Sequence, residues 1–320
     1  MPQYIKCLCA ATALLTLALH AQAPAPKGGS EDGSAVFRTD TRLVVLHVTV
    51  VDKTGHLVTT LPQNAFQVYE NGVQQQLKVF RREDVPVSMG LIVDNSGSMR
   101  DKRAKVEAAA LALVKASNPQ DEVFVVNFND EAFLDKEFTS DVKQMEEGLA
   151  RIDSRGGTAM RDAIRMSIDH LKEKAKKDKK VLVVVTDGND NSSQINLENL
   201  VRAAQQSETI IYTIGLLSEE ERREAKRAKR ALDALAEATG GQSYYPKELS
   251  QVESVCTQVA HDVRNQYILA YTPSNQALDG TFRTIKVIAN APNRPTVRTR
   301  SGYYATPEGA ESASKKSNSD

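Results

Sequence analysis

Two short, largely apolar runs, each followed at once by a cluster of acidic and hydroxyl residues, constrain the fold most strongly. The runs are residues 87–93 and 181–185, and neither alternates between apolar and polar side chains. A strand without such alternation is buried on both faces, which happens in parallel sheets that helices cover on both sides. We therefore expect the two runs to be the central pair of strands in one parallel sheet.

Between residues 86 and 265 the sequence alternates between strand-like and helix-like segments. Strands are expected at residues 87–93, 122–128, 133–138, 181–185, 210–216 and 243–245. Helices are expected at residues 103–116, 142–152, 159–174, 197–206, 219–238 and 249–263. Such alternation is typical of a doubly wound α/β domain, with a mostly parallel sheet and helices on both faces.

The flanking segments, residues 37–85 and 266–305, have β patterns instead. In the first, Asn71 and Gly72 tolerate positive φ and predict a hairpin turn, after which the chain returns over residues 76–80. In the second, strands are expected at residues 267–271, 281–289 and 295–304. Each flank is too small to bury a good core alone. We therefore predict that both flanks build one small β-sandwich, with the α/β domain inserted between them.

The N-terminus has the parts of a secretory signal peptide: a basic residue, a short apolar stretch and an A-x-A cleavage site. We expect residues 1–23 to be removed and the mature chain, without a membrane span, to reach the periplasm or the extracellular space. The alternative is a membrane anchor, but the stretch is shorter than the roughly 20 residues that span a bilayer. Residues 24–36 are expected to be a flexible leader and residues 306–320 a disordered tail.

Charge balance and cysteine usage narrow the classes of partner. Lys and Arg together number 41, as do Asp and Glu, so the charge balance does not favour nucleic acid as a partner. Cys256 is the only cysteine after the signal peptide, so no internal disulfide is expected. Its place on an apolar helical stripe predicts a buried thiol. The sequence leaves the oligomeric state open.

Polar residues gather where the two apolar runs end. Asp94, Ser96 and Ser98 follow the first run in the pattern Asp-x-Ser-x-Ser, and Asp187 follows the second within Thr-Asp-Gly. Thr158 lies between them in the chain, within Gly-Gly-Thr. Doubly wound sheets bind ligands beyond the carboxyl ends of their strands. We therefore expect these five residues to meet at one edge of the sheet.

These pieces resemble the metal ion-dependent adhesion site of von Willebrand factor type A domains, whose pattern is D-x-S-x-S, a distant Thr and a distant Asp. The resemblance covers roughly residues 86–265 and implies that the same five residues bind a metal ion. It also implies that the metal binds a carboxylate of a partner protein or peptide. The order of segments along the whole chain is similar to a VWFA-related domain family known from acidobacteria.

The donor chemistry of the five residues favours a hard cation. Carboxylate and hydroxyl oxygens suit Mg²⁺, the ion we expect, and also Ca²⁺ or Mn²⁺, rather than zinc. Only Asp94 and Asp187 carry a charge, so a bound divalent ion would stay electrophilic and could accept an external carboxylate at an open position.

The sequence favours a binding protein over an enzyme. We expect a secreted or periplasmic, adhesion-type module that recognises a partner's carboxylate through the metal. The first turn lacks the Gly-rich nucleotide-binding motifs and G-x-S-x-G. A hydrolase that uses the bound divalent metal is the alternative. An accessory subunit of a motor ATPase is a third interpretation, which the export signal disfavours.

Overall fold

The computed structural model describes residues 43–82, 84–150, 154–188, 190–217, 222–292 and 294–307. The expected signal peptide (1–23), the leader (24–36) and nearly all of the expected tail (306–320) therefore lie outside the described residues. Within these ranges, no helix combines the length and the apolar character that a membrane crossing requires.

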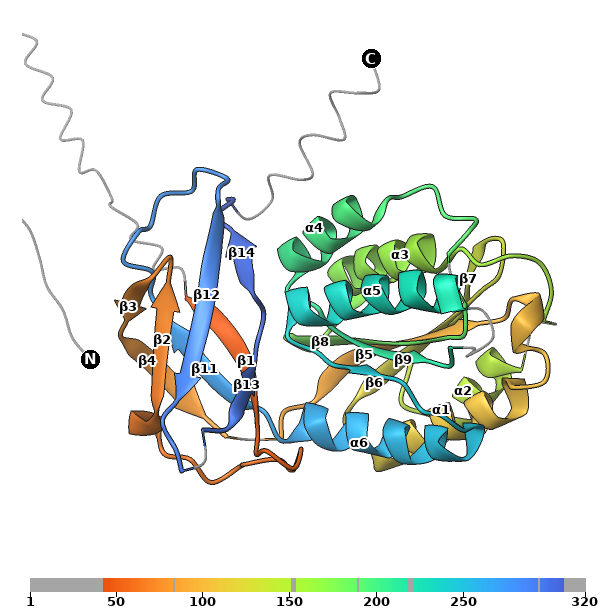
Figure 1. Ribbon diagram of the computed structural model, residues 1–320, viewed down its shortest axis with the longest axis horizontal. Helices are drawn as coiled ribbons and strands as arrows, with labels where there is room; N and C mark the ends of the chain where they lie inside the picture. The colour runs from red at the N-terminus through yellow and green to blue at the C-terminus, as the bar shows by residue number, and fades with distance from the viewer. Residues whose placement is uncertain are drawn as a thin grey trace, which may run out of the picture. The chain divides into compact units, whose positions relative to one another are not determined.

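A six-stranded sheet forms the centre of the α/β region, and Figure 1 shows it between two layers of helices. Its strands, in order across the sheet, are β10 (Ser243–Tyr244), β9 (Ile210–Gly215), β8 (Lys179–Thr186), β5 (Val87–Asp94), β6 (Glu122–Phe128) and β7 (Ala132–Thr139). Neighbouring strands are parallel except for β6 and β7, which pair antiparallel. The two apolar runs are the neighbouring strands β5 and β8. The predicted mostly parallel α/β sheet is therefore confirmed.

Helices cover both faces of this sheet (Figure 1). The helices on one face are α1 (Arg103–Ala116), α2 (Val142–Leu149) and α6 (Val252–Arg264). The helices on the other face are α3 (Met160–Lys174), α4 (Leu197–Ser207) and α5 (Arg222–Thr239). Met89 and Leu91 of β5 enter the first core and Ile92 enters the second, which explains why this run lacks polar alternation. Cys256 of α6 is buried in the first core, as predicted.

The flanking segments form two four-stranded sheets, each built from both ends of the chain. The strands of one sheet, in order, are β13 (Thr296–Arg298), β1 (Val44–Val51), β11 (Tyr267–Tyr271) and β4 (Leu77–Arg81). The strands of the other are β14 (Gly302–Tyr304), β12 (Phe282–Ala289), β2 (Phe66–Glu70) and β3 (Val73–Gln75). One core contains Leu46 and Phe66 from the first flank and Tyr267 and Ile285 from the second. Both flanks therefore contribute to one core, whereas the domain boundaries stay a prediction.

Two details of the flanks differ from expectation. Asn71 and Gly72 do form a turn with positive φ, but the strand that returns to β2 is β3, not residues 76–80. The chain then crosses to the other sheet, where β4 pairs with β11. The single strand expected at residues 295–304 is likewise two short strands, β13 and β14, in different sheets. In both places the expected strand is interrupted because the chain leaves one flanking sheet for the other, and side chains of both sheets share one core.

Candidate metal centre

The site begins where β5 and β8 end side by side. β5 ends at Asp94 and β8 ends at Thr186, with Asp187 next in the chain. The parallel register, in which Val93 pairs with Val185, brings both ends to the same edge of the sheet. The Thr186 hydroxyl donates a hydrogen bond of 2.6 Å to Oδ2 of Asp94. The pairing of two buried strands thus positions both predicted carboxylates.

The Asp-x-Ser-x-Ser loop joins the two carboxylates through hydrogen bonds. The backbone N–H of Ser96 donates to Oδ1 of Asp94 over 2.8 Å. Ser98 lies in the short 3-10 helix η2 (Gly97–Met99), and its Oγ is 3.1 Å from Oγ of Ser96. The Ser98 hydroxyl donates in turn to Oδ1 of Asp187 over 2.8 Å. Four of the five predicted site residues therefore form one continuous chain of hydrogen bonds.

Thr158 approaches the same edge from the loop before α3. It is 4% exposed, and a Cβ built on Gly188, in the Thr-Asp-Gly turn, would lie 3.7 Å from its Oγ1. Its backbone N–H donates to Oδ1 of Asn191 over 2.9 Å, and the N–H of Gly97 donates to the carbonyl of Gly156 over 3.2 Å. In the described part of the chain, no hydrogen bond joins the Thr158 hydroxyl to the other four site residues. Thr158 is thus a neighbour of the chain of hydrogen bonds rather than a member.

The Asp94 carboxyl is costly to ionise. The residue is 1% exposed, and burial raises its pKa to about 6, with the negative charge of Asp187 acting in the same direction. Hydrogen bonds from Ser96 and Thr186 lower the pKa and offset part of this effect. Two buried carboxylates at one edge repel each other and have lost contact with water, so a positive partner stabilises both. The electrostatics therefore favour a bound cation.

Lys102, which the sequence analysis did not identify, contacts the site. Its ammonium group forms an ion pair with Oδ2 of Asp187. The Lys102 side chain is 27% exposed and the Asp187 side chain 1%, so the lysine has access to solvent that the carboxylate lacks. No sequence signal distinguishes Lys102 from the other charged residues before α1. The ion pair shows that a cationic group fits against Asp187.

The donor atoms fit the expected divalent ion. All five residues offer oxygen, two as carboxylates and three as hydroxyls, and oxygen donors are what Mg²⁺, Ca²⁺ and Mn²⁺ prefer. The part of the chain that the structure describes contains no group of three or more His, Cys, Asp or Glu side chains placed to hold a metal. This site has only two such residues, so its cation affinity would depend on the hydroxyls as well.

Comparison with known proteins identifies the region that contains the site. Residues 89–189 match the family model of the von Willebrand factor type A domain. Calcium-activated chloride channel regulator 1 of Mus musculus is 28% identical over 172 residues, which are 50% of this chain and 17% of that protein. The corresponding protein of Equus caballus is 27% identical over 170 residues. The chain thus spans about one sixth of the length of these curated relatives.

The solved structures that match this chain have low sequence identity to it. A von Willebrand factor type A structure from Catenulispora acidiphila is 13% identical, with a TM-score of 0.49, and covers 86% of this chain and 76% of its own. An aerotolerance-related membrane protein from Bacteroides fragilis is 17% identical, with a TM-score of 0.46, and covers 55% of this chain and 98% of its own.

Proposed function

We propose, from the premise that this chain is a von Willebrand factor type A domain protein, that it is a secreted or periplasmic, adhesion-type module that binds a partner protein in a metal-dependent way. The metal would be a divalent cation, Mg²⁺ in the first instance. The partner would contribute an Asp or Glu carboxylate to it. No substrate is converted in this proposal.

The chain of hydrogen bonds from Asp94 through Ser96 and Ser98 to Asp187 supports this proposal most directly. It gathers two carboxylates and two hydroxyls, from loops far apart in sequence, beyond the carboxyl ends of β5 and β8. Doubly wound sheets bind their ligands at that edge. A helix cap would explain a serine-rich turn, but it would not explain why Ser98 contacts Asp187 in another loop.

Each residue would have a distinct task in this module. Asp94 and Asp187 would supply the two negative charges, and Ser96, Ser98 and Thr158 would supply neutral oxygens. When bound, the cation would offer an open coordination position to an external carboxylate. Lys102 would leave Asp187 as the cation binds, because both positive charges compete for the same carboxylate.

Affinity capture tests the proposal. The full mature chain, immobilised, should retain a protein from cell-envelope extract in Mg²⁺ and release it when a chelator is added. An Asp94→Ala bait should retain none of it. Asp101→Ala, which removes an exposed carboxylate seven residues away, should capture as the wild type does. Equal capture in Mg²⁺ and in chelator, or by the Asp94→Ala bait, would contradict the proposal.

A further inference from the structure

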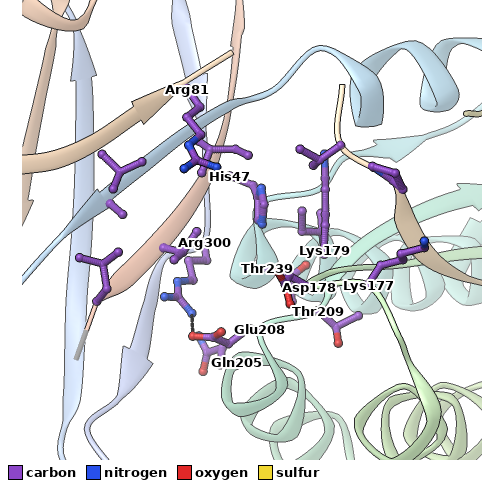
Figure 2. A pocket seen from close by; sticks show the side chains of 18 of the residues that line it. His47, Arg81, Lys177, Asp178, Lys179, Gln205, Glu208, Thr209, Thr239 and Arg300 are labelled. Carbon is purple, nitrogen blue, oxygen red and sulfur yellow. Dashed lines mark hydrogen bonds and ion pairs between the residues drawn. The ribbon is translucent and has the colours of Figure 1, made fainter. Parts of the chain in front are cut away.

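A second concave region lies at the opposite end of the central strands from the candidate metal centre. It is a pocket of about 550 Å³ near the amino ends of β5, β8 and β9, where Pro86, Lys179 and Ile210 line it. Residues of β1, β4 and β11 line its other side (Figure 2). None of the five predicted metal ligands lines this pocket, so its ligand would be separate from the partner proposed above.

Most of the side chains that the flanking sheet contributes to the pocket are apolar. Val44 and Leu46 of β1 face the core between the two flanking sheets, and the intervening Val45 lines the pocket. Val79 of β4 and Ile268 of β11 line it too. Apolar side chains on this face of the sheet gain stability only if something apolar covers them. No Phe, Tyr or Trp of the described residues lines the pocket, so the wall suits an aliphatic group better than a stacked ring.

Basic residues outnumber acidic ones around this wall. Four basic residues, Arg81, Lys176, Lys177 and Arg300, line the pocket, against only Asp178 and Glu208. Lys179 lines it too, but burial lowers its pKa to about 7, so it adds only part of a charge at neutral pH. Within the described ranges, the side chains of Arg81 and Lys177 form no ion pair. An excess of cationic groups beside a low-dielectric wall attracts anions.

Arg300 has two buried hydrogen-bond donors that are unpaired within the described ranges. The residue is 8% exposed, and its Nη1 donates to Oε1 of Glu208 over 2.8 Å, as Figure 2 shows. Its Nε and Nη2 are buried and have no partner among the described residues. These two N–H groups lie on one edge of the guanidinium, the arrangement that binds a carboxylate through two parallel hydrogen bonds. Because both atoms are covered, the Arg300 side chain would turn toward the pocket to present them to a ligand. A buried donor without a partner is costly, so an acceptor at this edge would stabilise the protein.

His47 of β1 lines the pocket and is affected by the positive charges around it. Its pKa is lowered to about 3 by burial and by the charges of Lys179 and Arg300, so the ring is neutral at pH 7. Its Nδ1 has no hydrogen-bond partner in the described part of the chain. The pocket thus combines an aliphatic wall, unpaired donors and surplus positive charge.

We propose that this pocket binds a small aliphatic carboxylate, with its hydrocarbon chain against Val45, Val79 and Ile268 and its carboxylate hydrogen-bonded to Arg300, while the positive charge of Arg81 on β4 adds attraction. The volume lies within the 300–1,000 Å³ range of ordinary small-molecule sites. Because the ligand would contact strands of the flanking sheet and strands of the central sheet at once, it would stabilise the folded chain by mass action.

Calorimetric titration of the full mature chain with octanoate at neutral pH tests the proposal. We expect one molecule to bind per chain and the midpoint of thermal unfolding to rise with octanoate concentration. Octanol, which has the same chain without the charge, should bind at least about tenfold more weakly, because a hydrogen bond to a charged group contributes about 1.5–3 kcal/mol. Octylammonium should not bind. Absence of octanoate binding, or equal binding of octanol, would overturn the proposal.

Variants assign the binding to these residues. Arg81→Gln, at an exposed position, should weaken octanoate binding severalfold without affecting the fold, because it removes a positive charge from the pocket lining. Arg300→Lys, which keeps the charge but loses the planar edge, should weaken it roughly tenfold. Lys143→Gln removes an exposed charge on α2 and should leave the affinity unchanged. If Arg81→Gln and Arg300→Lys both bind as Lys143→Gln does, the carboxylate is not held here and the assignment is wrong.

Discussion

The Ser98 hydroxyl donates a hydrogen bond of 2.8 Å to Oδ1 of Asp187, although 89 positions separate the two residues in the chain. The contact forms across the ends of β5 and β8, so it requires their parallel pairing. The candidate metal centre is therefore a product of the completed sheet rather than of a local loop. Substitutions at its carboxylates should change ion binding while leaving the packed strands beneath intact.

Asp94→Ala or Asp187→Ala should abolish divalent ion binding. Each removes one of the only two charged donors of the site, so the loss should exceed the 10- to 100-fold typical of outer-shell substitutions at metal sites. Titration calorimetry with Mn²⁺ and with Mg²⁺ measures the effect, and far-UV circular dichroism checks the fold. Asp101→Ala is the control, because its exposed side chain lies near the site without belonging to it. Unchanged ion binding in both site variants would refute the assignment.

Lys102→Gln should strengthen divalent ion binding. The lysine ammonium neutralises Asp187, so an incoming cation must displace it. Removing a competing charge about 4 Å away is worth at least the roughly 1 kcal/mol that it would be in water, which corresponds to an affinity gain of at least about fivefold. The gain should shrink at high ionic strength because salt screens the repulsion. Lys105→Gln, on the exposed side of α1, should have a much smaller effect. Weaker ion binding in Lys102→Gln would show that the lysine supports the site.

Thr158→Ala should impair partner binding more than ion binding. Its hydroxyl is beside the Thr-Asp-Gly turn but forms no hydrogen bond to the other four site residues in the described ranges. We therefore expect it to join the metal ligands mainly when a partner is bound. Ion affinity by calorimetry and partner retention by affinity capture are to be compared. Thr158→Ser keeps the hydroxyl and should behave as the wild type. An equal loss in both assays would make Thr158 an ordinary metal ligand.

The sequence alone was sufficient to predict the central strands of the α/β sheet and to predict that the candidate ligands lie at one edge of it. Apolar runs without alternation identify β5 and β8, and the residues that follow such strands must meet at one edge. Lys102 could not be found in this way, because its contact with Asp187 depends on a side-chain conformation. The separation of β3 from β4 was missed for a related reason. A turn sequence fixes the local hairpin but not the residue at which the chain leaves for another sheet.

Lys179 should make stability depend on pH. Burial lowers its pKa from 10.5 to about 7, although Asp84 and Asp121 partly offset this effect. Between pH 7 and 10.5 the unfolded chain binds a proton that the folded chain does not, so this group makes stability fall as pH decreases through that range. Below pH 7 both states bind the proton and the penalty is constant.

Lys179→Met should remove that dependence. We compare the free energy of unfolding of the variant with that of the wild type at the same pH. The variant's advantage should be larger at pH 7.5 than at pH 10 by up to a few kcal/mol, because each pKa unit corresponds to about 1.4 kcal/mol. The lost hydrogen bond from the Lys179 amine to the Val263 carbonyl lowers stability at both pH values and cancels in this comparison. Urea unfolding at the two pH values measures the difference. For the control Lys180→Met, at the next position of β8, the stability difference from the wild type should be the same at both pH values. If the difference for Lys179→Met is also independent of pH, the Lys179 amine is charged in the folded chain and the prediction is wrong.

Deleting the chain from Tyr267 onward should unfold the N-terminal flank while the central sheet persists. β1 lies between β11 and β13, so the deletion removes both of its neighbours and leaves its backbone groups without partners. It also removes Tyr267 and Ile285 from the core that covers Leu46. Hydrogen exchange should show lost protection of β1 amides and retained protection in β5 and β8. Because α6 ends at Arg264, only two residues before β11, the same strands would transmit any shift of α6 on ligand binding to the flanking sheets. If the β1 amides stay protected without β11 and β13, the flanks do not depend on each other and this coupling is absent.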